Sequence, residues 1–144
     1  MTMARDVMHA GAMCVGEDQS LLDAARMMRD HGVGALPICG QDQKLKGIIT
    51  DRDIVLRCLA EGKDPATMKA RELAGHLHCV RADDDMDTVL RKMEQHQIRR
   101  IPVIDGDRLV GVISEVDLAT GHREGQRLTD HQILEFMDKM YTKA

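Results

Sequence analysis

The sequence GIITDRD at residues 47–53 returns in modified form as GVISEVD at residues 111–117. Each copy follows a short apolar segment that contains a proline, ALPIC in the first copy and IPVI in the second. Equivalent positions are 65 residues apart at these prolines and 64 residues apart at the motif glycines, because the intervening turn is one residue longer in the first copy. A repeat of this kind fixes the architecture before any single motif does, so we expect two copies of one unit.

The pattern of apolar residues predicts the same secondary structure in both copies. Leu21, Ala24 and Met28 recur at the spacing of an amphipathic helix, and the equivalent helix contains Leu90. Strands are expected near residues 14–15 and 79–80, at 35–39 and 45–50, and at 101–104 and 109–114, with closing helices at 54–59 and from 118 onward. The sequence therefore predicts an α/β (α+β) fold built from two β-α-β-β-α units.

Composition narrows the class of protein. With 144 residues, of which 43% are hydrophobic and 31% charged, the chain suits a compact globular protein rather than a disordered one. No apolar run approaches the roughly 20 residues of a membrane-spanning helix. The N-terminal sequence MTMARDVMHAG carries charges where an export signal needs an apolar core. We therefore expect a cytoplasmic protein without a membrane partner.

Charge and aromatic content argue against nucleic acid as a partner. The net charge is −4, whereas proteins that bind phosphate backbones concentrate Lys and Arg on one surface. Phe136 and Tyr141 are the two aromatic residues, and both lie near the C-terminus. The rest of the chain therefore has no platform for stacking an unpaired base, and a bound base would lie between aliphatic side chains.

Each half resembles a CBS (cystathionine-beta-synthase) motif, and the two halves together resemble the pair known as a Bateman module. The resemblance rests on Gly, two apolar residues, Thr or Ser, two further residues and Asp, present twice after an apolar-Pro-apolar strand. It implies a first motif at residues 4–62 and a second at residues 68–122, packed about a pseudo-twofold axis, and a homodimer. The segments ARDVM, GALPICG and TDRDIV are similar to the stand-alone CBS pairs called hypoxic response proteins.

The resemblance implies an adenosine-containing ligand bound between the two repeats, such as AMP, ADP, ATP, NAD or S-adenosylmethionine, with no other cofactor required. It assigns phosphate contacts to Thr50 and Ser114, and ribose contacts to the carboxylates of Asp53 and Asp117. A fixed carboxylate suits a ribose diol because charge-assisted hydrogen bonds are among the stronger ones. Capping of the following helices is the structural alternative, and it explains Thr and Ser more readily than Asp.

Basic residues distinguish the two expected ligand sites. The family often has a phosphate-contacting cation three positions before the strand proline, and this position is Arg99 in the second half but Gly34 in the first. Arg52 adds a cation to the first half, although solvent exposure is the structural alternative for both arginines. The strand prolines, Pro37 and Pro102, complete the predicted ligand-binding set. The two sites should therefore be unequal, with the Arg99 site better suited to phosphates.

The cysteines indicate a second kind of chemistry. Cys14 and Cys79 occupy equivalent positions, which favours small buried residues. Cys14 and Cys39 could nevertheless end neighbouring strands and form a redox-sensitive pair or a disulfide, although disulfides are uncommon in the cytosol. His76, His78 and Cys79 are metal-capable types, but they would alternate in direction along a strand, so no metal site is predicted.

The sequence contains no nucleophile elbow, P-loop or HExxH motif, so we predict a non-enzymatic regulatory protein that signals to an unknown effector protein. Two alternatives stay open. One is a stress-related interaction protein that does not bind nucleotide, and the other is a redox- or metal-responsive module that uses Cys14 and Cys39. An amphipathic helix at residues 127–143 lies outside the repeat, and its apolar face must cover either its own chain or a partner.

Overall fold

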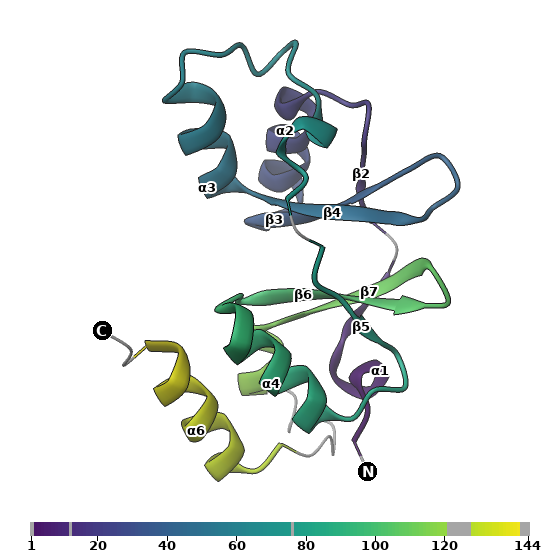
Figure 1. The fold of residues 1–144 in the computed structure, drawn as a ribbon, viewed down its shortest axis with the longest axis vertical. Coiled ribbons are helices and arrows are strands. Elements are labelled where there is room, and N and C mark those ends of the chain that lie inside the picture. Colours follow the sequence, from purple (N-terminus) through teal and green to yellow (C-terminus); the bar gives the residue numbers. More distant parts are fainter. Residues whose placement is uncertain (1, 12, 76, 121–127, 142–144) are drawn as a thin grey trace. The chain divides into compact units, whose positions relative to one another are not determined.

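The computed structural model describes residues 2–11, 13–75, 77–120 and 128–141. The chain forms two compact units, which are drawn in Figure 1. The first-repeat unit comprises Ala12–His78 and Asp107–Leu109, and the second-repeat unit comprises Met1–Gly11, Cys79–Gly106 and Val110–Ala144. The N-terminal segment thus belongs with the second repeat, although it precedes the first repeat in the sequence.

In the first-repeat unit, helix α2 (Leu21–His31) connects two parallel strands, β2 (Val15–Gly16) and β3 (Ala35–Cys39). Strand β3 pairs antiparallel with β4 (Leu45–Thr50), which gives the sheet order β2-β3-β4. Helix α3 (Asp51–Ile54) follows directly and continues as the π-helical turn η1 (Val55–Leu59). The 3-10 turn η2 (Ala70–Leu73) completes the unit.

The second-repeat unit has the same order of elements, with additions at both ends. The repeated elements are β5 (Val80–Arg81), α4 (Met86–His96), β6 (Arg100–Asp105), β7 (Arg108–Ser114) and α5 (Glu115–Thr120). Helix α1 (Ala4–Val7) leads into β1 (His9–Ala10), which pairs antiparallel with β7 and gives the sheet order β1-β7-β6-β5. Helix α6 (Asp130–Tyr141) is the last element. The predicted β-α-β-β-α order is confirmed in both repeats.

Side-chain caps fix where the long helices begin. At the start of α2, Ser20 Oγ accepts a hydrogen bond from the Asp23 N–H (3.0 Å), and the Asp23 carboxylate accepts one from the Ser20 N–H (3.4 Å). This reciprocal arrangement is a capping box. Asp85 caps α4 by accepting a hydrogen bond from the Thr88 N–H (2.8 Å), and this bond lowers the pKa of Asp85 below its usual range.

Each unit buries its own apolar core, and each core includes the segment that leads into the other repeat. Turn η2 precedes the second repeat but lies in the first-repeat core, whereas α1 precedes the first repeat but lies in the second-repeat core. Full burial of one aliphatic side chain contributes about 1.5–3 kcal/mol. The first-repeat core includes Val15, Leu21, Leu36, Ile38, Ile49, Ala70 and Leu73, and the second-repeat core includes Ala4, Val7, Val89, Met93, Ile101, Val103 and Ile113.

The motif glycines lie where these leading segments cross the sheets. A Cβ on Gly47 would lie 3.0 Å from the Ala74 Cβ, just after η2. A Cβ on Gly111 would lie 2.6 Å from Met8 Sδ and 2.8 Å from the His9 carbonyl oxygen, just after α1. Because these approaches leave no room for a side chain, chain packing alone accounts for the glycine of the repeated motif.

Helix α6 packs on its own unit, which decides the question that the sequence left open. Phe136 is 1% exposed and joins Met140 in the second-repeat core, whereas Leu134 on the outer face is 68% exposed. In Figure 1, α6 lies alongside α4. The ends of the expected helix, residues 127 and 142–143, fall outside the described residues. No helix in the described part of the chain is both long enough and apolar enough to cross a membrane.

We predict that Gly111→Ala lowers the free energy of unfolding by about 1–3 kcal/mol, the usual effect of overpacking a close contact. The His9 carbonyl oxygen is part of the backbone of β1, so it cannot rotate out of the way. Gly75→Ala is the matched control, because nothing lies within 4 Å of the Cβ that it would add. Urea unfolding followed by circular dichroism measures both values. Equal stabilities of the two variants would contradict the crossing contact.

Candidate functional site

The junction between β4 and α3 brings Thr50 and Asp53 together. The Thr50 hydroxyl accepts a hydrogen bond from the Asp53 N–H (3.1 Å), and Asp53 Oδ2 accepts one from the Thr50 N–H (3.0 Å). Both residues are half-buried. The end of the strand and the first turn of the helix are therefore tied by two reciprocal hydrogen bonds, and these bonds fix the orientation of the carboxylate.

The junction between β7 and α5 repeats this arrangement with Ser114 and Asp117. Asp117 Oδ2 accepts hydrogen bonds from the Ser114 N–H (2.8 Å) and from the Ser114 hydroxyl (3.0 Å). The Asp117 N–H lies 3.4 Å from Ser114 Oγ. Both residues are half-buried, as their counterparts are. The two repeats thus present one hydroxyl–carboxylate pair each, in closely similar local geometry.

These hydrogen bonds account for the aspartates as well as for the hydroxyl residues. Each pair satisfies backbone N–H groups at the start of a helix, where no partner within the helix exists. Capping therefore explains more of the motif than the sequence suggested, and it does not by itself require a ligand. In each pair, however, Oδ1 of the aspartate has no hydrogen-bond donor among the described residues. This oxygen is the acceptor that remains available to a ligand.

The same backbone link stands next to each junction, but the side chains differ. The Asp51 N–H donates to the Gly34 carbonyl oxygen (2.9 Å), and the Glu115 N–H donates to the Arg99 carbonyl oxygen (3.1 Å). This link places Arg99 beside the Ser114 junction, where its side chain is exposed. The equivalent place in the first repeat carries no charge, because Gly34 has no side chain. The two junctions therefore share this backbone link and differ in the side chains beside it.

The remaining predicted ligand residues lie in different environments. Arg52 is exposed on α3, next to Thr50 and Asp53. Pro37 is buried in β3, where it pairs with Ile48 of β4, and Pro102 is buried in β6. The prolines are thus part of the packed strands, whereas the arginines are accessible to solvent.

Tyr141, the last residue of α6, lies at the second junction, and the sequence analysis did not place it there. Its ring centroid is 5.1 Å from the guanidinium carbon of Arg99, within the range of a cation–π contact. Its hydroxyl donates to the Glu115 carboxylate, at 2.5 Å from Oε1 and 2.7 Å from Oε2, and this hydrogen bond raises the pKa of Tyr141. Arg99 lies in the loop between α4 and β6, Glu115 on α5 and Tyr141 on α6, so no sequence spacing could indicate this cluster.

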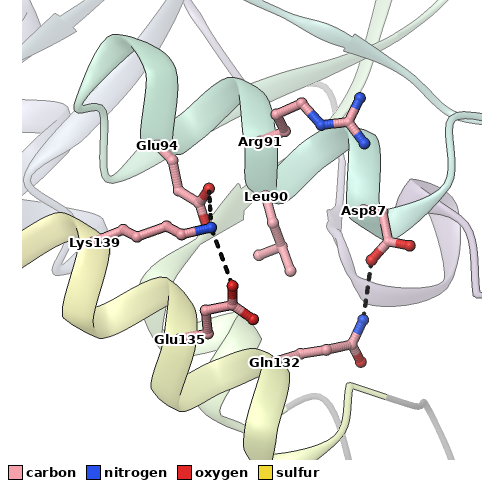
Figure 2. A pocket seen from close by; sticks show the side chains of 7 residues that line it. All are labelled: Asp87, Leu90, Arg91, Glu94, Gln132, Glu135 and Lys139. Carbon is pink, nitrogen blue, oxygen red and sulfur yellow. Dashed lines mark hydrogen bonds and ion pairs between the residues drawn. The ribbon is translucent and has the colours of Figure 1, made fainter.

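A polar groove of about 210 Å³ lies between α4 and α6 (Figure 2). Lys139 of α6 forms ion pairs with Glu94 of α4 (3.6 Å) and with Glu135 (3.2 Å), and Gln132 Nε2 donates to Asp87 (3.1 Å). None of the predicted ligand residues lines this groove. Because several of its polar groups pair with one another across the two helices, the groove is a feature of how α6 is held.

Cys14 and Cys39 lie side by side as free thiols in the first-repeat unit. The hydrogen bond between them lowers the pKa of Cys14, whereas this bond and burial raise the pKa of Cys39. Within the ranges that the structure describes, no three metal-capable side chains form a cluster, and His76 of the metal hypothesis falls outside those ranges.

Comparison with known proteins yields relatives along nearly the whole chain. Hypoxic response protein 1 from Mycobacterium tuberculosis is 49% identical over 138 residues, which cover 95% of this chain and 92% of that protein. A crystal structure of Hypoxic Response Protein I with two coordinated zinc ions is similar with a TM-score of 0.78 at 52% identity, covering 82% of this chain and 97% of that one. A third similar protein is the CBS domain pair of protein MJ0100, whose crystal structure is a complex with 5′-methylthioadenosine and S-adenosyl-L-methionine. Its TM-score is 0.73 at 27% identity, and the match covers 88% of this chain and 99% of that one.

The CBS domain family matches the chain twice, at residues 4–59 and 70–121. The two matched segments contain the two hydroxyl–carboxylate junctions, one in each segment. Sequence repeat, fold and relatives thus agree, and the chain belongs to the CBS domain family, of which it carries two repeats.

Proposed function

We propose that this chain is a non-enzymatic regulatory protein that binds an adenosine-containing ligand and signals the binding to an effector protein. The observation that carries this proposal is the hydroxyl–carboxylate pair, which recurs with similar geometry at the same strand-to-helix junction of both repeats. The CBS pair of MJ0100 is in complex with two ligands that share an adenosine group, which supports the chemical class of the ligand.

In this proposal, Asp53 and Asp117 accept hydrogen bonds from ribose hydroxyls through Oδ1. The caps engage Oδ2 of each carboxylate, so ribose binding leaves the caps intact. Because each carboxylate is oriented before the ligand arrives, less conformational entropy is lost on binding. The Thr50 hydroxyl only accepts in its cap, so its proton is available to a phosphate group. The Ser114 hydroxyl donates to Asp117 Oδ2, so it contributes to phosphate binding by turning its proton from that oxygen to the phosphate.

We infer that the two sites differ in their preference for phosphate. Arg99 stands beside the Ser114 junction, whereas the first repeat has Gly34 at that place and relies on the exposed Arg52. An arginine guanidinium can donate two parallel hydrogen bonds to a phosphate. ADP or ATP should therefore prefer the second site, whereas S-adenosylmethionine, which has no phosphate, gains nothing from Arg99.

Signalling requires that the ligand binds one state of the protein or of its complex more tightly than another. The surfaces of η1 and α5 expose apolar side chains, among them Val55 (51% exposed), Leu59 (54%) and Val116 (69%). We propose that these side chains contribute to a homodimer, as the family resemblance implies. A change in dimer geometry on ligand binding would then be the signal that an effector protein reads.

The ligand assignment is tested by thermal shift and isothermal titration calorimetry with AMP, ADP, ATP, NAD and S-adenosylmethionine. Asn still caps a helix but lacks the charge, so Asp53→Asn and Asp117→Asn should each weaken binding at the altered site. Hydrogen bonds to a charged group contribute about 1.5–3 kcal/mol, so we expect a loss of about 10- to 100-fold. Asp23→Asn is the matched control, because Asp23 has the same capping role at α2. If Asp53→Asn and Asp117→Asn bind the ligand as tightly as the Asp23→Asn control, the assignment of these aspartates to the ligand site is wrong.

A second candidate function is a redox response of the Cys14–Cys39 pair. The observation that favours it is that the two free thiols lie on adjacent strands, where Cys39 lowers the pKa of Cys14. A thiol with a lowered pKa reacts more readily because more of it is thiolate. Oxidation to a disulfide would release two protons and transfer two electrons to an oxidant of the disulfide or peroxide class. This function does not exclude ligand binding, because Thr50, Arg52 and Asp53 take no part in the thiol contact.

We predict that Cys14 reaches half-maximal alkylation by iodoacetamide at a lower pH in the folded protein than in the urea-unfolded chain. The hydrogen bond with Cys39 stabilises the Cys14 thiolate, so the thiolate persists to lower pH than in the unfolded chain. Cys39→Ala removes this bond and should move the half-point to higher pH. Cys58→Ala is the control, because Cys58 instead hydrogen-bonds to the Lys63 carbonyl oxygen. Mass spectrometry of the Cys14 peptide gives the rates, and identical half-points in the folded and unfolded chains would rule out the activated thiol.

A further inference from the structure

We propose that Tyr141 is a positioning residue of the second ligand site: its ring holds the Arg99 guanidinium, and its hydroxyl holds the Glu115 carboxylate away from that cation. The inference rests on the proposed function, because Arg99 is the residue that distinguishes a phosphate-bearing ligand from adenosine alone. It adds the C-terminal helix, which lies outside both matched CBS segments, to the ligand site.

The first part of the argument is the contact with Arg99. The Tyr141 ring lies 5.1 Å from the guanidinium carbon, and this is the contact that the Arg99 side chain makes among the described residues. A ring engages the face of a guanidinium, whereas a phosphate engages the N–H groups on its edge. Stacking on Tyr141 therefore restricts the motion of Arg99 and leaves its hydrogen-bond donors available to an anion.

The second part is the contact with Glu115. Glu115 and Arg99 are neighbours, because the Glu115 N–H donates to the Arg99 carbonyl oxygen at 3.1 Å. A carboxylate beside a guanidinium ordinarily pairs with it, and such a pair would occupy the N–H groups that a phosphate needs. The Tyr141 hydroxyl donates to both Glu115 carboxylate oxygens, at 2.5 and 2.7 Å, and so offers this acid a different partner.

The third part is the anchorage of Tyr141. Phe136 and Met140, which precede it on α6, are buried in the second-repeat core, so the end of α6 is fixed to its unit. Helix α6 is also held to α4, because Lys139 forms an ion pair with Glu94 and Gln132 donates a hydrogen bond to Asp87 across the groove in Figure 2. Tyr141 itself remains 48% exposed and the Arg99 side chain is exposed, so a ligand can reach the contact between them.

The equivalent place in the first repeat has neither partner for such a tyrosine. Gly34 replaces Arg99 and Asp51, a shorter acid, replaces Glu115, although the backbone link between them is the same. Tyr141 therefore serves the second site alone. Its expected effect is on the affinity gained by adding phosphates to adenosine, and it should leave the affinity for adenosine nearly unchanged.

The experiment measures by calorimetry how much more tightly ADP binds than adenosine, in the wild-type protein and in four variants. We expect Tyr141→Ala to lower this ratio by about tenfold, because Arg99 becomes mobile and Glu115 can pair with it. Tyr141→Phe keeps the ring but frees Glu115, so it should also lower the ratio, and Tyr141→Phe combined with Glu115→Gln should restore it. Leu134→Ala, on the exposed face of the same helix, is the control and should not change the ratio.

A merely structural role of Tyr141 would weaken ADP and adenosine equally, so an unchanged ratio in Tyr141→Ala overturns the inference. Failure of the double variant to restore the ratio overturns the role assigned to the hydroxyl. If the wild-type protein binds none of the adenine ligands, the proposed function is wrong. The contact between Tyr141 and Arg99 can then still be tested by a measurement that needs no ligand. The NMR signal of the Arg99 side-chain N–H, identified by its loss in Arg99→Lys, should move in Tyr141→Ala as the ring current disappears. An unmoved signal overturns the inference in that case as well.

Discussion

The reciprocal hydrogen bonds at the two strand-to-helix junctions are the constraint on which fold and proposed site both depend. They end β4 and begin α3 in the first repeat, and they end β7 and begin α5 in the second. The same bonds hold one oxygen of Asp53 and of Asp117 in a fixed direction and leave the other unused. A structural turn and a preorganised acceptor are therefore one arrangement, and the capping role of the motif does not compete with the ligand role that we propose.

Equivalent backbones with different side chains explain how one duplicated unit provides two different sites. The link from Gly34 to Asp51 matches the link from Arg99 to Glu115, so the chain path beside each junction is the same. Among the described residues at this link, the second repeat has Arg99, the longer acid Glu115 and the Tyr141 ring from α6. The first repeat has Gly34 and Asp51 at the link, and its cation is Arg52 on α3. The duplicated units thus share one backbone arrangement, and a few side chains together with helix α6 make the two junctions different.

Much of the fold follows from the sequence, because it rests on local periodicity and on the repeat. The order of strands and helices was predicted and is found. The assignment of α1 to the second-repeat core was not predictable, since buried residues such as Val7 show that a helix is covered but not by which repeat. The Tyr141 cluster was equally hidden, because its contact with Arg99 depends on how α6 docks on the second-repeat unit.

The central claim is that an adenosine-containing ligand binds at the two hydroxyl–carboxylate junctions. The most direct measurement is an NMR titration of the ¹⁵N-labelled protein with ADP, with assigned backbone amide signals. The account predicts that the signals of residues 114–117 and of Arg99 change first, and that those of residues 50–53 change at higher ligand concentration. Saturable changes confined to other parts of the chain, with these signals unmoved, would contradict it.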